Sequence, residues 1–377
     1  MLFHLFSLIL SAIEEPTITM IHTTGMDGSK YYRIPAIAKA KNGTIICACD
    51  KRGDSNADLA QPIQIVIRKS YDDGFTFDSP LIIAGTGKDY GYSDPSLLID
   101  EKTGAVLCVF NAGNRFQSST PTNQIRNVYC ISYDNGETWS DPIDFTPQIY
   151  GSQCTDVFRK TWNAAFVVSG SGIQTRDGKL MFMIVARVPN IGGYPIHTLW
   201  TEDLGRTWHV GAQSCALGDE TKVVQLDNNS LLASVRNRPR KFVISNNLGE
   251  SWEHEVLRPE MIDPGCNGDI HRYTSVRDGY DKSRLIHTNQ YHSSSRRNLT
   301  IKISYDEGNT WKYTKSLYLE LSAYSAVEIA NDGSILIYFE KETTGAIYEM
   351  ALMRVSLEYI TDGEDKYTPP SKTAKEL

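Results

Sequence analysis

The sequence predicts an all-β fold, a six-bladed β-propeller of four-stranded antiparallel sheets with tight hairpin turns. An eight-residue pattern, S/T-x-D/N-x-G-x-S/T-W/F, occurs five times in the 377 residues, and its copies begin at Ser70, Ser132, Thr201, Ser245 and Ser304. The intervals between these starts fit one four-stranded sheet with its loops. A radial array of such sheets is a propeller.

Each copy of the repeat has the chemistry of a hairpin tip. We expect its Asp or Asn side chain to accept hydrogen bonds from backbone N–H groups two residues further on, and its glycine to supply a positive φ. The closing aromatic residue would pack against an apolar layer. The runs 63–67, 128–131 and 299–303 precede three of the copies and are rich in β-branched residues, which predicts strands.

The repeat spacing also predicts the domain organisation. It divides the region from Thr17 to Tyr359 into about six blades, one of which has lost its turn. We therefore assign residues 17–360 to one propeller domain and residues 361–377 to a polar C-terminal tail. A sandwich of unrelated hairpins is the alternative, but a sandwich does not repeat one turn sequence five times.

Residues 1–13 form an apolar N-terminal segment that is followed at once by Glu14, Glu15 and Pro16. It is too short to span a bilayer and has the length of a signal-peptide core, although it lacks the usual positive start. We expect secretion, or a cell-surface or lysosome-like compartment. A cytoplasmic location stays open, and a first propeller strand is the structural alternative for the segment.

Composition excludes several classes of partner and scaffold. The net charge of −7 argues against nucleic acid or an anionic membrane surface as a partner. Seven cysteines leave at least one unpaired, which is not typical of a disulfide scaffold. The eight histidines are scattered without metal-ligand spacing, so we expect neither a metal nor a cofactor.

Arginines stand at the edges of three strand-like runs. Arg33 lies in the segment Tyr-Arg-Ile-Pro at 32–35, Arg236 follows the apolar run 231–235, and Arg296 and Arg297 precede the run 298–303. Arginines delivered from three blades can converge on one anion, because guanidinium groups bind carboxylates through paired N–H donors.

At these residues the chain resembles the sialidase (neuraminidase) family over nearly its whole length. The Tyr-Arg-Ile-Pro segment at 32–35 and the repeated turn, called the Asp box in that family, carry the resemblance. It implies a retaining exo-α-sialidase that hydrolyses terminal sialic acid from glycoproteins, gangliosides and oligosaccharides, with no stable membrane span.

Sialic acid carries a carboxylate directly on its anomeric carbon, and the resemblance implies that Arg33, Arg236 and Arg296 bind it. Arg297 is the alternative for the third position, because alternation sends the two neighbouring side chains to opposite faces of a strand. The spacing before 298–300 favours Arg296.

Sialidases use a tyrosine nucleophile where most glycosidases use a carboxylate. A carboxylate would bring a second negative charge to a carbon that already bears one, whereas a phenol would not. The segment 321–327 resembles the strand of the family's nucleophile and implies Tyr324. A phenol with a pKa near 10 needs a base, and Glu220, in the segment 218–224 upstream of Arg236, matches the family's activating glutamate.

The resemblance implies Asp58 as the general acid and base, because of its spacing from Arg33 and its place on a glycine-containing loop. Asp54 on the same loop is the alternative. Glu340, in the segment 337–340 downstream of Tyr324, resembles the glutamate that pairs with the first arginine. Two further residues resemble those that touch the sugar's ring substituents, Arg52 and Asp94.

Two other functions fit part of these observations. A trans-sialidase, including an intramolecular one, would pass the sialyl group to a hydroxyl group instead of water with the same residues. A non-catalytic sialic-acid-binding propeller would use the arginines but would have no need of a phenol–carboxylate pair. A glycosidase for neutral glycans would leave three converged arginines without a counter-charge, which is electrostatically costly.

Overall fold

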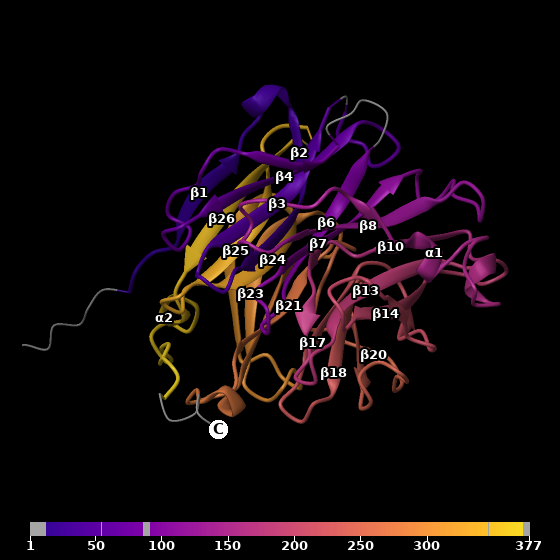
Figure 1. The fold of residues 1–377 in the computed structure, drawn as a ribbon. Coiled ribbons are helices and arrows are strands. Elements are labelled where there is room, and N and C mark those ends of the chain that lie inside the picture. The colour runs from indigo at the N-terminus through magenta and orange to yellow at the C-terminus, as the bar shows by residue number, and fades with distance from the viewer. Residues whose placement is uncertain (1–12, 54, 86–90, 346, 372–377) are drawn as a thin grey trace, which may run out of the picture.

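Six four-stranded units follow one another around the ring of the computed structural model, which describes residues 13–53, 55–85, 91–345 and 347–371 (Figure 1). Blade 1 comprises β2 (Tyr31–Lys39), β3 (Ile45–Arg52), β4 (Ile63–Ser70) and β5 (Leu81–Ala84). Blade 2 comprises β6 (Tyr92–Ile99), β7 (Val106–Gly113), β8 (Ile125–Ser132) and β9 (Ile143–Asp144). Blade 3 comprises β10 (Ala164–Val167), β13 (Leu180–Arg187), β14 (Pro195–Thr201) and β15 (His209–Val210).

Blade 4 comprises β17 (Thr221–Gln225), β18 (Leu231–Val235), β19 (Lys241–Ser245) and β20 (Val256–Leu257). Blade 5 comprises β21 (Asp269–Thr274), β22 (Arg284–Gln290), β23 (Arg297–Ser304) and the first part of β24 (Tyr313–Ile329). Blade 6 comprises the last part of β24, β25 (Ile335–Glu342), β26 (Tyr348–Val355) and β1 (Thr17–His22). The predicted all-β propeller is confirmed.

Short elements complete the described chain. Three short strands add to the sheets of blades 2 and 3, namely β11 (Gly170–Ser171), β12 (Ile173–Gln174) and β16 (Ala216–Leu217). The helical elements are α1 (Thr146–Ile149), α2 (Leu357–Ile360) and the 3-10 turns Met26–Gly28, Arg159–Thr161 and Val276–Asp278. No helix within the described residues has the length and apolar content needed to cross a membrane.

The ring closes by pairing the two ends of the propeller. β1 runs antiparallel to β26, and Figure 1 shows the indigo β1 beside the yellow β26. The outer strand of blade 6 therefore precedes the rest of its blade in the chain. Because the repeated turn joins the third strand of a blade to the fourth, blade 6 has no such connection. This explains why six blades carry five turns.

The repeated turns satisfy their polar groups differently from the sequence expectation. Asp72 accepts a hydrogen bond from the backbone N–H of Thr76, four residues further on rather than two, at 2.9 Å. The N–H of Gly74 donates to the Ser70 hydroxyl at 2.8 Å. Gly74 has a φ of +92°, and a Cβ there would lie 2.9 Å from Leu352 of blade 6. The turn therefore needs glycine both for its conformation and for its close packing on the neighbouring blade.

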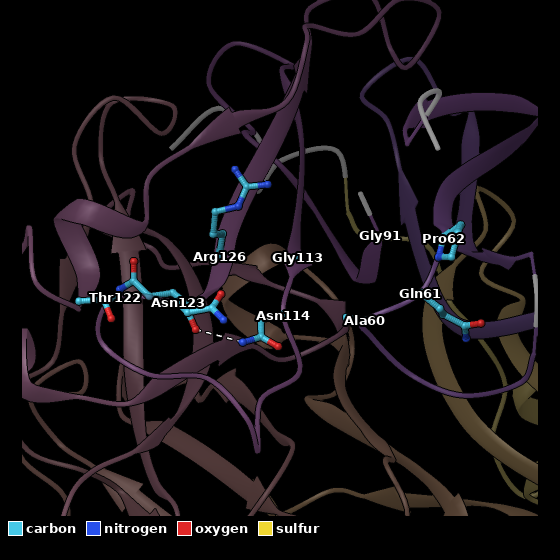
Figure 2. A pocket seen from close by; sticks show the side chains of 10 residues that line it. Ala60, Gln61, Pro62, Gly91, Gly113, Asn114, Thr122, Asn123 and Arg126 are labelled. Carbon is cyan, nitrogen blue, oxygen red and sulfur yellow. Dashed lines mark hydrogen bonds between the residues drawn. The ribbon is translucent and has the colours of Figure 1, made fainter. Parts of the chain in front are cut away.

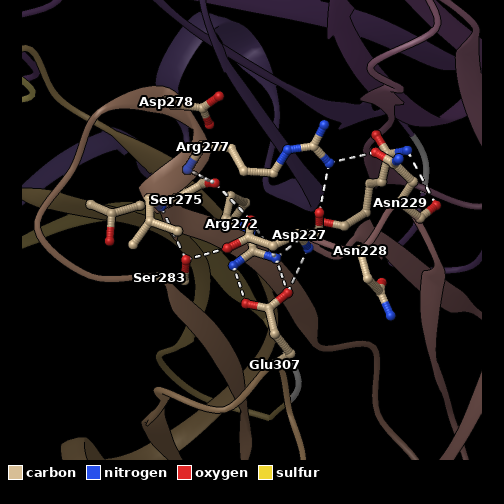
Figure 3. A network of polar contacts seen from close by, with 12 residues as sticks. Asp227, Asn228, Asn229, Arg272, Ser275, Arg277, Asp278, Ser283 and Glu307 are labelled. Atoms are coloured by element: carbon tan, nitrogen blue, oxygen red, sulfur yellow. Dashed lines mark hydrogen bonds and ion pairs between the residues drawn. The ribbon is translucent and has the colours of Figure 1, made fainter. Parts of the chain in front are cut away.

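A polar network ties blades 4 and 5 together through one of these turns (Figure 3). Arg272 on β21 forms two hydrogen bonds with Glu307 of the fifth turn, at 2.7 and 2.6 Å. The same carboxylate accepts the backbone N–H of Asp227 from the β17–β18 connection at 2.8 Å. Cations and anions alternate in this network, which gives it a structural role.

The hydrophobic core lies in layers between neighbouring blades. One layer joins Ile37 and Val66 of blade 1 to Leu336 and Tyr338 of blade 6. All seven cysteines are buried free thiols. Residues 1–12, which make up nearly all of the predicted apolar N-terminal segment, and Asp54, the alternative general acid, lie outside the described residues.

Candidate active site

Three arginines from different blades surround one tyrosine. Tyr324, on β24, is buried, and the centroid of its ring lies 5.3 Å from the Cζ of Arg33, 6.0 Å from that of Arg236 and 5.4 Å from that of Arg296. Arg297 is exposed and donates instead to the carbonyl of Leu319 at 3.4 Å. The fold therefore brings Arg33, Arg236 and Arg296 together around Tyr324, and Arg297 has a different environment.

Glu340, on β25, organises the first arginine. Its Oε1 accepts from Arg33 Nε at 2.9 Å and from the Ile34 N–H at 2.8 Å, while its Oε2 accepts from Arg33 Nη2 and from the Tyr324 N–H, both at 3.0 Å. The side chain of Glu340 has no exposed surface. Four donors on two oxygens hold the Arg33 fork in one orientation, because a bidentate pair fixes both position and plane.

The backbone of β2 is irregular where it supplies these donors. Ile34 has a φ of +64°, which a β-branched residue rarely adopts. The register of β2 against β3 shifts between Arg33 and Ala36. This conformation directs the Ile34 N–H to Glu340 while the Arg33 side chain stays in the site. The strain in the Tyr-Arg-Ile-Pro segment thus serves to position both the Ile34 N–H and the Arg33 side chain.

Tyr324 and Glu220 share a contact with Arg236. Arg236 Nη1 donates to the Tyr324 hydroxyl at 3.0 Å and to a carboxylate oxygen of Glu220. Burial raises the pKa of Tyr324 well above its usual value, and Glu220 adds to this, although the arginines oppose it. Burial also raises the pKa of Glu220, and Arg236 partly offsets the effect. The phenol is therefore neutral at rest, beside a carboxylate that holds a proton more readily than an exposed one.

Asp58 lies at the rim of the site, on the loop between β3 and β4. Its side chain is 75% exposed, and its Oδ1 lies 3.0 Å from Nη1 of Arg52. Arg52 itself has no exposed surface; it donates to Asp50 at 2.9 Å and to the carbonyl of Asn56 at 2.6 Å. Asp50 and the Asp58 loop both engage the guanidinium of Arg52, and its contact with the sugar stays a prediction. Arg52 holds that loop in place.

Asp94 is the third residue of β6 and lies close enough to Asp58 and Glu220 for their charges to act on it. Its backbone N–H donates to Asp50 at 3.0 Å, and its Oδ2 accepts from Asn111 at 3.3 Å. Burial raises the pKa of Asp94 well above its usual value, and the charges of Asp50 and Asp58 add to the shift. The half-buried carboxyl group can therefore donate as well as accept a hydrogen bond.

Four residues of the site escaped the sequence analysis. The ring of Tyr348 lies 4.8 Å from the Cζ of Arg33, and Asp219 approaches Arg236 at 3.6 Å. Cys266 packs against Tyr324, and burial raises the pKa of its thiol to about 12. Lys222 is buried two residues after Glu220 on β17, with no hydrogen-bond partner among the described residues. Of the four, only Lys222 had a sequence signal, since alternate residues of a strand share a face.

The known proteins that this chain resembles are sialidases and BNR repeat-like domains. The model of the BNR repeat-like domain family matches residues 95–337. A sialidase from Bacteroides fragilis (strain YCH46) is 28% identical over 376 residues, which cover 93% of this chain and 65% of that protein's length. The solved structure of the Hadza microbial sialidase Hz136 superimposes with a TM-score of 0.79 at 26% identity and covers 91% of this chain and 69% of that one.

A third comparison concerns the fold alone. The intramolecular trans-sialidase from Ruminococcus gnavus, solved in complex with oseltamivir carboxylate, has a TM-score of 0.75 at 17% identity and covers 93% of this chain and 99% of that one. The chain thus spans the full length of one structural neighbour but about two thirds of the Bacteroides protein.

No group of His, Cys, Asp or Glu side chains among the described residues has the arrangement of a metal site.

Proposed function

Because the chain belongs to the sialidase family of BNR repeat-like propellers, we propose that it is a retaining exo-α-sialidase acting on terminal sialic acid of glycoproteins, glycolipids and oligosaccharides. One observation carries the proposal: Arg33, Arg236 and Arg296 surround Tyr324, whose hydroxyl shares Arg236 with Glu220. Three cations around a neutral phenol suit a substrate with a carboxylate at its reacting carbon.

In the first step the arginines hold the sugar's carboxylate next to the Tyr324 hydroxyl. The Tyr324 oxygen attacks the anomeric carbon and passes its proton to Glu220. The bond to the leaving oxygen breaks, and Asp58 gives that oxygen a proton. The products are a sialyl–tyrosine glycoside on the enzyme and a free hydroxyl on the departing sugar. The raised pKa of Glu220 favours its role as proton acceptor, since the base and the phenol are then better matched.

In the second step Asp58, now ionised, takes a proton from a water molecule that attacks the same carbon. The bond to Tyr324 breaks, and Glu220 returns its proton to the phenol oxygen. Two successive inversions give net retention. The exposure of Asp58 at the rim suits this role, because it must meet both the leaving sugar and the incoming water.

Transfer to another hydroxyl group, on an acceptor sugar or on the same sialic acid, would use the same residues with a different second nucleophile. Sialyl transfer is therefore the second candidate function, since the chain also shares its fold with an intramolecular trans-sialidase. Product analysis separates the two, because hydrolysis gives free sialic acid whereas transfer gives a new sialoside or an anhydro sugar.

Release of a fluorescent aryl group from an aryl sialoside tests the proposal. We expect turnover by the wild type and a loss of at least about a thousandfold in kcat for Tyr324→Phe. Tyr313→Phe is the matched control, because Tyr313 lies on the same strand but hydrogen-bonds Glu364 outside the site. A wild type that binds sialic acid without turnover would instead identify a sialic-acid-binding propeller.

A further inference from the structure

Lys222 carries a buried ammonium group that the proposed mechanism does not use. It lies two residues after Glu220, and alternate residues of a strand point to the same face about 7 Å apart. Only 3% of Lys222 is exposed, and its Nζ has no hydrogen-bond partner among the described residues. A buried charge is costly unless an opposite charge or polar groups stabilise it. The surroundings of this group therefore call for an explanation.

The Nζ of Lys222 lies where blades 2, 4 and 5 meet. A Cβ on Gly170 would lie 2.4 Å from this nitrogen, and Gly170 pairs with Ser96 of β6. Because paired residues of a sheet point to the same face, the Ser96 side chain is directed to the side on which Lys222 lies. The neighbouring Ser169 hydroxyl accepts from Asn267 Nδ2 at 3.1 Å, just before β21 of blade 5. Side chains from three blades therefore converge near the ammonium group.

This cluster is polar and closed to the surface. Ser96 and Asn267 are buried, and the Ser96 Oγ and Asn267 Oδ1 have no hydrogen-bond partner among the residues that the structure describes. The open pocket of about 640 Å³ in Figure 2 lies beside the Asp58 loop, and none of its lining residues belongs to the cluster. Such oxygens are the partners that a buried water molecule needs. They can solvate the ammonium group of Lys222, but they cannot neutralise it.

Carboxylates lie near this ammonium group without a direct hydrogen bond to it. Burial lowers the pKa of Lys222, and the charge of Asp269 opposes this effect more than any other charge does. Glu220 and Asp94 also oppose it, whereas Arg240 adds to it. Asp269 is therefore the principal counter-charge of Lys222.

Asp269, at the start of β21, depends on Lys222 in return. Its blade neighbours that of Lys222, since β17 and β21 lie side by side. Asp269 is 2% exposed, and its Oδ2 accepts the Val327 N–H at 2.8 Å, which fixes the carboxylate. Burial raises the pKa of Asp269, and Lys222 opposes this ahead of His271. Each of the two buried charges thus stabilises the other, as in an ion pair.

We propose that Lys222 and Asp269 form a buried ion pair between blades 4 and 5, which holds a fixed positive charge beside the proposed base Glu220. The inference rests on the proposed function. The charge favours the ionised form of Glu220, which is the form that accepts the proton of Tyr324. Lys222 acts through Glu220 and does not touch the substrate, so it is a positioning residue.

The other groups that act on Glu220 line the substrate site itself, namely Arg236, Asp219 and Tyr324. In the proposed mechanism Arg236 binds the carboxylate of the sugar, so its effect on Glu220 changes when substrate arrives. Lys222 is buried, and its charge is the same with and without substrate. The ion pair therefore supplies the constant part of the field at the base.

A double-mutant cycle tests the pair through the melting temperature, Tm. Lys222→Met and Asp269→Asn each leave one buried charge without its partner, and each should lower Tm by about 5 °C. The double variant removes both charges and should melt above either single variant. The matched control is Lys241→Met with Glu255→Gln, an exposed pair at 2.7 Å, whose effects on Tm should be small and additive.

The pH dependence of kcat/KM on an aryl sialoside tests the effect on Glu220. Loss of the Lys222 charge raises the pKa of Glu220, so the acidic limb should move up by about one pH unit in Lys222→Met and in the double variant. Asp269→Asn keeps the ammonium group and should leave the limb in place. The double variant thus regains stability without regaining the wild-type limb, which a purely structural role would not produce.

A double variant that melts no higher than the less stable single variant would overturn the ion pair. An acidic limb that stays in place in both variants without Lys222 would overturn the positioning role. Wild-type protein that does not turn over the aryl sialoside would refute the proposed function and the positioning role with it, whereas the Tm cycle would still measure the pair. The failure of the pair and the failure of the function are therefore distinguishable.

Discussion

Replacing Glu340 by glutamine should cost far more stability than its small change in shape suggests. The carboxylate accepts four hydrogen bonds from Arg33, Ile34 and Tyr324, two on each oxygen. A glutamine keeps one acceptor oxygen and sets an NH2 group against two donors. It also leaves the Arg33 charge without its buried partner. Breaking such a pair costs about 3–5 kcal/mol, a large part of the about 5–15 kcal/mol that holds a domain folded.

Urea denaturation of Glu340→Gln measures this cost through the free energy of unfolding, and kcat/KM on an aryl sialoside measures the loss of the oriented Arg33. Glu255→Gln is the matched control, because Glu255 pairs with Lys241 at 2.7 Å on the surface and should contribute less than about 1 kcal/mol. If the free energy of unfolding of Glu340→Gln lies within about 1 kcal/mol of the wild-type value, the reasoning is refuted.

The same substitution should change the pH dependence of stability. Burial opposes ionisation of Glu340, but Arg33 together with the backbone N–H donors of Ile34 and Tyr324 outweighs it, so the pKa of this carboxyl is lowered in the folded protein. A depressed pKa gives stability that is fully present above the unfolded value of about 4.3 and is lost as pH falls through the folded value. The difference between the wild type and Glu340→Gln should therefore shrink in acid. A constant difference from neutral pH to about pH 3 would contradict this.

Two further predictions concern the three arginines around Tyr324 and the proposed base, Glu220. Arg296→Ala should lower kcat/KM at least about thirtyfold, and Arg297→Ala less than about threefold; comparable losses in both would invalidate the assignment. Lys222→Met should move the acidic limb of the kcat/KM profile to higher pH, because the positive charge of Lys222 lowers the pKa of Glu220 and also faces Asp269 and Asp94. Lys222→Arg keeps the positive charge and should leave the acidic limb of the kcat/KM profile at the same pH. If the acidic limb also stays in place in Lys222→Met, the charge of Lys222 does not lower the pKa of Glu220.

Local sequence predicted the blades because the residues of the repeated pattern hydrogen-bond to one another. In the first copy the bonds among Ser70, Asp72, Gly74 and Thr76 lie within seven residues, so the pattern is visible in the sequence. The expected donor was wrong by two residues, since the backbone path through the positive φ of Asp73 and Gly74 decides which N–H faces the carboxylate. That path depends on packing against the next blade, which the sequence pattern does not reveal.

The site was less predictable where its contacts cross between blades. Arg33, Arg236 and Tyr324 could be named because each lies in a recognisable segment. The burial of Arg52 could not, because it depends on Asp50, whose partner Ser93 comes from blade 2. Contacts of this kind depend on how two sheets face each other, and this orientation has no signature in either strand alone.

Closure of the ring and the placement of Arg33 beside Tyr324 both depend on contacts between blade 6 and blade 1. Arg33 belongs to blade 1 and Glu340 to blade 6, and the two lie 307 residues apart in the chain. The carboxylate of Glu340 also receives the backbone N–H of Tyr324. In the proposed mechanism, the groups that bind and attack the substrate are therefore positioned only when the last blade meets the first. It follows that mutations which weaken the β1–β26 pairing, far from any substrate atom, should reduce catalytic activity along with stability.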